Sequence, residues 1–143
     1  MKSAIQSLDV SCILHATEDG GRVSAAVRDL VGEGANFELE EMEGHFGNSI
    51  RKLSLHLHGA DATRAFARLV ARMPEVLRSS VAGDMDKLVD EHSSLYLRFD
   101  KQRLVQGELA AGHDDAVRLK VKPRAFLMHG QAKGFFLSQM KAG

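Results

Sequence analysis

The segment Ile50-Arg-Lys-Leu-Ser-Leu-His-Leu-His58 decides the fold, because polar and apolar side chains alternate along it from Lys52 onward. In an extended chain successive side chains point to opposite faces. One face of this segment carries three leucines, and the other carries Lys52, Ser54, His56 and His58. This period of two predicts a half-buried strand of an antiparallel sheet.

Five further segments are predicted to be strands, at residues 8–16, 36–42, 95–100, 104–109 and 116–122. Segment 95–100 turns Leu95, Leu97 and Phe99 inward, and segment 104–109 is expected to be its hairpin partner. Segment 116–122 repeats the alternation, with Val117, Leu119 and Val121 toward the core. We therefore expect Leu53, Leu55 and Leu57 to share one buried sheet face with these residues.

Apolar residues at helical spacing lie between the predicted strands. Thr17 is expected to cap a first helix, with Glu18 and Asp19 complementing its dipole. A second helix is expected to start near Asp61, helical pieces to continue over 76–89, and a short helix to follow Arg124. The resulting fold class is α+β, a single domain over residues 1–143. It has one mixed, mostly antiparallel sheet with helices packed on one face, in the order β-α-β-β-α-β-β-β-α.

The composition is that of an ordinary folded domain, with 44% hydrophobic and 27% charged residues among 143. Nineteen Lys and Arg balance nineteen Asp and Glu, so net charge will not attract a polyanion and any such binding depends on local charge placement. The only cysteine, Cys12, lies among apolar residues and is expected to belong to the core. No stretch resembles a signal peptide or a membrane span, which predicts a cytoplasmic protein without membrane contact.

Cations and one aromatic residue gather on the face of the predicted sheet that is turned away from the core. They are Lys52, His56, His58, Tyr96, Arg98, Arg118, Lys120 and Lys122. If the strands are neighbours, the cations can contact phosphates while Tyr96 stacks on an unpaired base. The alternative is an ordinary solvated face. The same choice applies to the stripe of Arg64, Arg68 and Arg72, which has few acidic neighbours in sequence.

Two other kinds of site are weaker alternatives. His56 and His58 share a strand face, but the sequence identifies no further ligand for a metal. The acidic residues Glu40, Glu41, Glu43, Asp114 and Asp115 allow a metal-dependent nuclease, although adjacent carboxylates are more often turn and cap residues. We expect no catalytic residue, no bound metal and no cofactor.

Four segments resemble a family of small archaeal proteins described as RNA-binding or as predicted exosome subunits. They are His15-Ala-Thr-Glu-Asp19, Glu43-Gly-His-Phe-Gly-Asn-Ser-Ile50, Tyr96-Leu-Arg-Phe-Asp-Lys-Gln102, and Gly107-Glu-Leu109 followed by Asp114-Asp-Ala-Val-Arg118. The matching polar residues are His15, His45, Asn48, Arg98, Asp100, Lys101 and Gln102. The resemblance implies a fold similar to that of the ribosomal protein that binds 5S ribosomal RNA, and association with RNA.

The sequence and the resemblance together predict a non-catalytic RNA-binding protein in RNA processing, exosome-related or ribosome-related work. Its partners would be RNA and other processing subunits. The alternative is a protein-interaction subunit of such an assembly that does not itself touch RNA. The residues expected to bind RNA, including a predicted hairpin tip at 100–103, are Lys52, His45, Asn48, Tyr96, Arg98, Lys101, Gln102, Arg103, Arg118, Lys120 and Lys122.

Overall fold

The protein has five strands in the part of the chain that its computed structural model describes, which is residues 4–32, 36–43, 47, 49–124 and 129–142. The strands form one sheet in the order β2-β3-β1-β5-β4, and all four neighbouring pairs are antiparallel. Their bounds are Ile5–Leu14 (β1), Phe37–Glu43 (β2), Ser49–His58 (β3), Leu95–Asp100 (β4) and Ala116–Pro123 (β5). The α+β class is confirmed, with a sheet that is antiparallel throughout.

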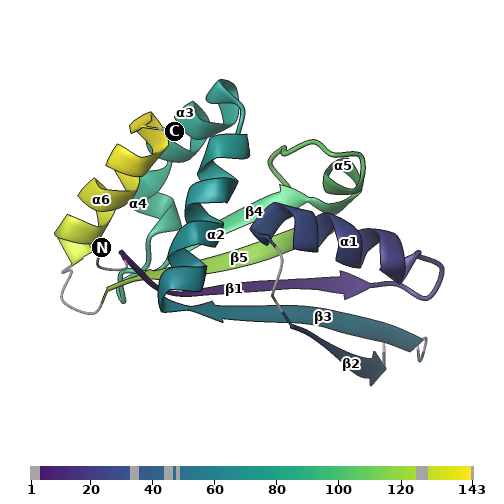
Figure 1. Cartoon of the computed structure of the whole chain (residues 1–143). Coiled ribbons are helices and arrows are strands. Elements are labelled where there is room, and N and C mark those ends of the chain that lie inside the picture. The colour runs from purple at the N-terminus through teal and green to yellow at the C-terminus, as the bar shows by residue number, and fades with distance from the viewer. Residues whose placement is uncertain (1–3, 33–35, 44–46, 48, 125–128, 143) are drawn as a thin grey trace.

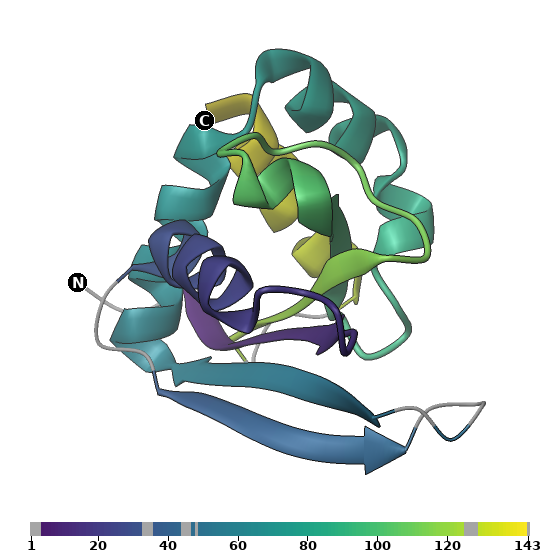
Figure 2. The same cartoon turned by 90° about the vertical axis from the view of Figure 1, so that its right-hand side faces the viewer.

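Six helices accompany the sheet in the described residues, and Figures 1 and 2 show them over one face, with the opposite face of the strands uncovered. They are Gly20–Val31 (α1), Gly59–Arg72 (α2), Glu75–Gly83 (α3), Met85–Leu88 (α4), Lys101–Val105 (α5) and His129–Ala142 (α6). Helix α2 packs on β1 and β3, and α6 packs on α3 and α4. Among the residues described, no helix has the length and apolar character needed to cross a bilayer.

The core lies between the helices and the covered face of the sheet. The predicted face is confirmed, because all seven of its marker residues are buried: Leu53, Leu55, Leu57, Leu97, Phe99, Leu119 and Val121. Cys12 is also in this core, where burial raises the pKa of its thiol to about 11, as expected for a structural rather than a reactive cysteine. In α6, Phe136 and Met140 face the same core, so the predicted C-terminal helix is present and is 14 residues long.

The first helix is capped by Asp19, and the prediction that Thr17 caps it is wrong. The Asp19 carboxylate accepts hydrogen bonds from the backbone N–H groups of Gly21 and Arg22, at 3.0 and 3.3 Å. Thr17 lies in the preceding turn, which Glu18 closes by donating its N–H to the carbonyl of His15. Thr and Asp are both favoured at helix N-caps, and the backbone turn places Asp19, not Thr17, at the N-terminal end of α1.

The predicted strand at 104–109 is also wrong, since this stretch contains the end of a short helix. Asp100 ends β4 and caps α5, its carboxylate accepting the N–H of Arg103 at 2.9 Å. Gly107, with φ at +87°, follows the helix in a conformation that favours glycine. The true partner of β4 is β5, so 95–100 and 116–122 are direct neighbours.

Candidate nucleic-acid interface

The uncovered side of the sheet, called the open face below, carries the predicted cations on adjacent strands. In the register of β4 with β5, Arg98 lies opposite Arg118 and Tyr96 lies opposite Lys120. On the other side of β5, β1 places Ser11 beside Arg118, Asp9 beside Lys120 and Ser7 beside Lys122. Five of the predicted residues are therefore brought together on β4 and β5: Tyr96, Arg98, Arg118, Lys120 and Lys122.

Arg98 and Arg118 form a like-charge pair across two strands. The carbonyl of Arg98 accepts the N–H of Gly112 on the outer edge of β4, so the backbone of Arg98 points away from β5. Such non-hydrogen-bonded positions bring opposing side chains closest, with Cα atoms about 4.5 Å apart. Neither guanidinium forms an ion pair with any residue in the described part of the chain. Opposed like charges destabilise a sheet, so this pair favours an anion on the face.

Tyr96 offers an exposed aromatic ring next to these cations. It is 41% exposed, and the Lys120 ammonium lies 5.8 Å from the ring centroid. Desolvation raises the pKa of Asp90, but hydrogen bonds from Ser94, from the Tyr96 side chain and from His92 lower this pKa more. Asp90 thus holds Tyr96 at the edge of the sheet, where its ring can stack on a base.

Two connected hollows run over this half of the open face. The first, of about 420 Å³, lies over β1, β5 and β4 and is lined by polar side chains that include Asp9, Arg98, Arg118 and Lys120. The second, of about 450 Å³, lies at the end of β1 and is lined among others by His15, Lys52, Asp114 and Asp115. Ser11 and Arg118 line both. We call the two together the face groove.

The other half of the open face has balanced charge. Lys52 on β3 lies opposite Glu40 on β2, and Nδ1 of His56 contacts the Asp9 carboxylate on β1. The rings of His56 and His58 meet edge to face, with centroids 4.1 Å apart. Burial, and to a smaller extent repulsion from His58, lower the pKa of His56, which favours its neutral imidazole. Positive charge is therefore concentrated on β4 and β5.

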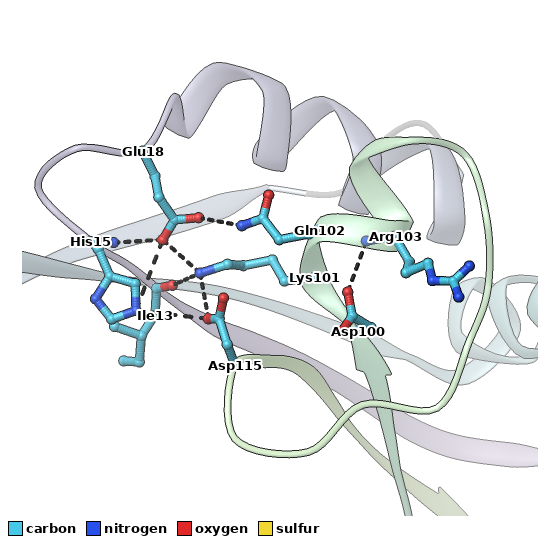
Figure 3. Close-up of polar contacts among 8 residues, drawn as sticks. All are labelled: Ile13, His15, Glu18, Asp100, Lys101, Gln102, Arg103 and Asp115. Atoms are coloured by element: carbon cyan, nitrogen blue, oxygen red, sulfur yellow. Dashed lines mark hydrogen bonds and ion pairs between the residues drawn. The ribbon is translucent and has the colours of Figure 1, made fainter.

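Lys101 is not at an exposed hairpin tip as predicted, because its side chain is buried at the start of α5 (Figure 3). Its ammonium donates to the carbonyl of Ile13 at 2.7 Å, to Glu18 at 2.6 Å and to Asp115 at 2.7 Å. Three donors thus meet three acceptors. Lys101 therefore joins α5 to β1, to the turn before α1 and to the loop before β5, and it is unavailable to a ligand on the open face.

Charge compensation governs the protonation of this cluster. Burial lowers the pKa of Lys101, but its bonds to Asp115 and Glu18 raise this pKa more, so the ammonium stays charged. Burial raises the pKa of Glu18, and the bonds from Lys101 and the His15 N–H bring it below its ordinary value. His15, Glu18 and Asp115 are near enough to one another to hold a metal ion, but the Lys101 ammonium already compensates both carboxylates. The cluster is built as an ion-pair network.

The other predicted residues lie elsewhere. Gln102 and Arg103 are exposed on α5, which packs on α1 in the helical layer, and they bind Glu18 at 3.3 Å and Glu108 at 2.8 Å respectively. They do not join the open face. His45 and Asn48 lie outside the described residues.

The arginine stripe on α2 has acidic partners that the sequence did not reveal. Arg68 and Arg72 both form ion pairs with Asp29 of α1, at 3.5 and 3.3 Å, and Arg64 pairs with Asp61 one turn away. The stripe therefore helps to join two helices, which favours its interpretation as an ordinary helix surface.

The residues that meet near the face groove were also not predicted from the sequence. His15, Glu18, Lys101 and Asp115 come from three of the four family-like segments and converge at one end of the sheet. Their only signal in the sequence was membership of those segments, since Glu18 and Lys101 are 83 residues apart.

Fold and surface together define a small α+β protein with an open antiparallel sheet whose exposed face is basic along one half. The chain belongs to the RNA-binding family, whose model, described as "RNA binding", matches residues 7–123. It is 28% identical over 138 residues to the RNA-binding protein PAB1135 of Pyrococcus abyssi, covering 92% of this chain and 90% of that protein. It is also 28% identical over 122 residues to the uncharacterized protein MJ0213 of Methanocaldococcus jannaschii, covering 80% and 81%.

A solved structure agrees with the family and the fold. The structure of Mth689, a DUF54 protein from Methanothermobacter thermautotrophicus, is 30% identical in sequence, with a TM-score of 0.75. The match covers 96% of this chain and 98% of that chain. The predicted membership of an archaeal RNA-binding family is thereby confirmed, whereas exosome association and likeness to the ribosomal protein stay predictions.

Proposed function

We propose that the protein binds RNA without cleaving it, on the half of the open face formed by β1, β5 and β4. The supporting surface is the face groove, with its cations on β4 and β5 and the exposed ring of Tyr96. Phosphates supply most of the affinity of such contacts, and base stacking adds to it without demanding a sequence. Membership of the RNA-binding family supports the same ligand.

The observation that carries this proposal is the Arg98 and Arg118 pair. Two arginines that face each other in one cross-strand pair, without an acidic partner among the described residues, destabilise the sheet through repulsion. A phosphate that binds between them removes this repulsion and gains charge-assisted hydrogen bonds, which guanidinium groups form in a planar fork. On a solvated face that binds no ligand, the same pair would only lower the stability of the sheet.

The test is an RNA-binding titration of the double variant Arg98→Gln with Arg118→Gln at several salt concentrations. Binding should weaken for all RNA sequences alike, and the slope of log affinity against log salt should become shallower by roughly one unit for each cation removed. The matched control replaces Arg64 and Arg103 by Gln, which changes net charge equally but on the helical layer. Equal loss of affinity in the two double variants would contradict the proposed surface.

The finer role that we propose is in RNA processing or ribosome-related work, with exosome subunits as candidate partners. The resemblance of the four segments supports it, since they belong to proteins described in those terms. Crosslinking in cells followed by sequencing of bound RNA tests this role. Recovery of ribosomal or processing intermediates is the expected outcome, and recovery of no RNA above background would argue against it.

A further inference from the structure

A third hollow, called the edge hollow below, lies beyond the outer edge of β4, between that strand and helices α3 and α4. It measures about 470 Å³, within the range of about 300–1,000 Å³ that small-molecule pockets occupy. Leu77, Val81 and Leu88 supply apolar lining, and Ser80, Asp84 and Lys87 supply polar groups. Its remaining wall is the edge of β4 itself, with Gly112 beside it.

The wall of the edge hollow presents one backbone donor and one backbone acceptor. Because Arg98 C=O points outward to Gly112, the carbonyl of Tyr96 and the N–H of Arg98 point to the same outer side. Neither of these two groups has a hydrogen-bond partner on that side among the described residues. The Watson–Crick edge of an unpaired base carries neighbouring donor and acceptor groups that match such a pair, and proteins that read single-stranded RNA use that edge.

The edge hollow and the face groove share part of their lining. Tyr96, Leu97 and Arg98 of β4 line both. A strand of RNA whose phosphates lie at Arg98 and Arg118 therefore has a base within reach of the β4 edge. We propose that the edge hollow is a nucleobase pocket that takes one unpaired base of the bound strand, an inference that rests on the proposed function.

An added peptide strand fits this edge less well. Isolated bridges from Val89 to Leu95 and from Phe99 to Ala111 occupy both ends of β4, so the free edge is only as long as one donor and one acceptor. Strand addition gains its affinity from a row of main-chain hydrogen bonds, which this short gap does not provide. Gly112 closes one end tightly, since a Cβ there would lie 2.6 Å from backbone atoms of Phe99 and Asp100.

The experiment compares oligoadenylate with an abasic ribose-phosphate strand of the same length. Ser80→Trp fills the edge hollow, and Ser79→Trp is the matched control, because Ser79 is equally an exposed α3 serine but faces the surface between α3 and α6. Ser80→Trp should weaken oligoadenylate binding by roughly tenfold, as expected for the loss of one stacked base. Ser79→Trp should bind like the parent, and the abasic strand should bind all three proteins equally.

Amide hydrogen exchange gives a second readout. It is measured on the unaltered protein, so it does not depend on whether a variant folds correctly. Oligoadenylate should slow exchange at the N–H of Arg98, and the abasic strand should not. The pocket would be overturned if the unaltered protein bound oligoadenylate and the abasic strand with equal affinity. It would also be overturned if only an extended peptide protected the N–H of Arg98, because this edge would then bind a protein partner. If salt-dependent binding fails to respond to Arg98→Gln with Arg118→Gln, the proposed function fails instead, so the two failures are distinguishable.

Discussion

Lys101 Nζ lies 2.7 Å from Oδ1 of Asp115, so a buried ammonium at the start of α5 holds the loop that leads into β5. The same ammonium bonds Glu18 and the carbonyl of Ile13, on segments more than 80 residues earlier. One side chain thus fixes the end of β1 and the start of β5, two of the strands beneath the face groove.

Replacing Lys101 with Met should destabilise the protein by about 3 kcal/mol, because two carboxylates then lose the charge that compensates them. This value is at the lower end of the range for buried pairs, since Asp115 is half exposed and solvent screens it. Chemical denaturation at neutral pH measures the change. A variant as stable as the parent would show that the ion-pair network contributes nothing.

The cost of Lys101→Met should depend on pH. The pKa of Glu18 is lower in the folded protein than its ordinary value of 4.5. Glu18 therefore stabilises the fold at pH values above 4.5, and this stabilisation is lost as the pH falls through the folded pKa. The raised pKa of Lys101 keeps its own contribution until pH rises past 10.5 and through the folded pKa. The stability difference between parent and variant should therefore be widest near neutral pH and narrow below about pH 4. A difference constant from pH 3 to 8 would contradict this assignment.

Replacing either Arg98 or Arg118 with Gln should stabilise the free protein slightly, by roughly 0.2–1 kcal/mol at low salt. The reason is relief of repulsion between two guanidiniums in one cross-strand pair. The gain should shrink at high salt, where surface charges are screened. Thermal unfolding at two ionic strengths checks this, and a loss of stability at low salt would show that the pair is not repulsive.

Asp19→Ala should cost about 1 kcal/mol, since two N–H groups at the start of α1 lose their acceptor. Thr17→Ala is the control and should change the free energy of unfolding little, because Thr17 is exposed in the turn before the helix. If denaturant titrations showed a loss of stability for Thr17→Ala and none for Asp19→Ala, Thr17 would be the cap.

Leu55→Ala should destabilise the protein by about 2–5 kcal/mol through lost burial and the cavity left behind. Leu55 is 3% exposed, lies in the middle of the pairing of β3 with β1, and pairs with Phe37 at the start of β2. A lowered denaturant midpoint is the expected measurement, and an unchanged midpoint would mean that the site collapses without cost.

The strands that alternate strictly were predictable, because burial of one sheet face imposes a period of two on sequences such as 52–58 and 95–100. The short helix after Asp100 was missed although its signal was present, an aspartate cap followed by Lys-Gln-Arg-Leu, all good helix formers. The prediction of a strand over 104–109 overlooks this cap.

The candidate site was predictable only in part. Strand alternation placed Tyr96, Arg98, Arg118 and Lys120 on one face, and the structure brings them together. Nothing local in the sequence told Lys101, a buried lysine, from an exposed one, since its partners Glu18 and Asp115 lie on other elements. Pairings of this kind depend on tertiary contacts between distant segments.

The position of β1 at the centre of the sheet constrains how the chain acquires its fold during synthesis. Its partner on one side, β3, follows within the first 58 residues, whereas the register with β5 joins Ile5 to Pro123. A nascent chain can thus form β1, β3 and β2 while the other edge of β1 stays unpaired until the C-terminal third has left the ribosome. Closing so long a loop is slow, and an unpaired strand edge invites pairing with other chains. Chaperone protection of this intermediate would matter most before β5 emerges.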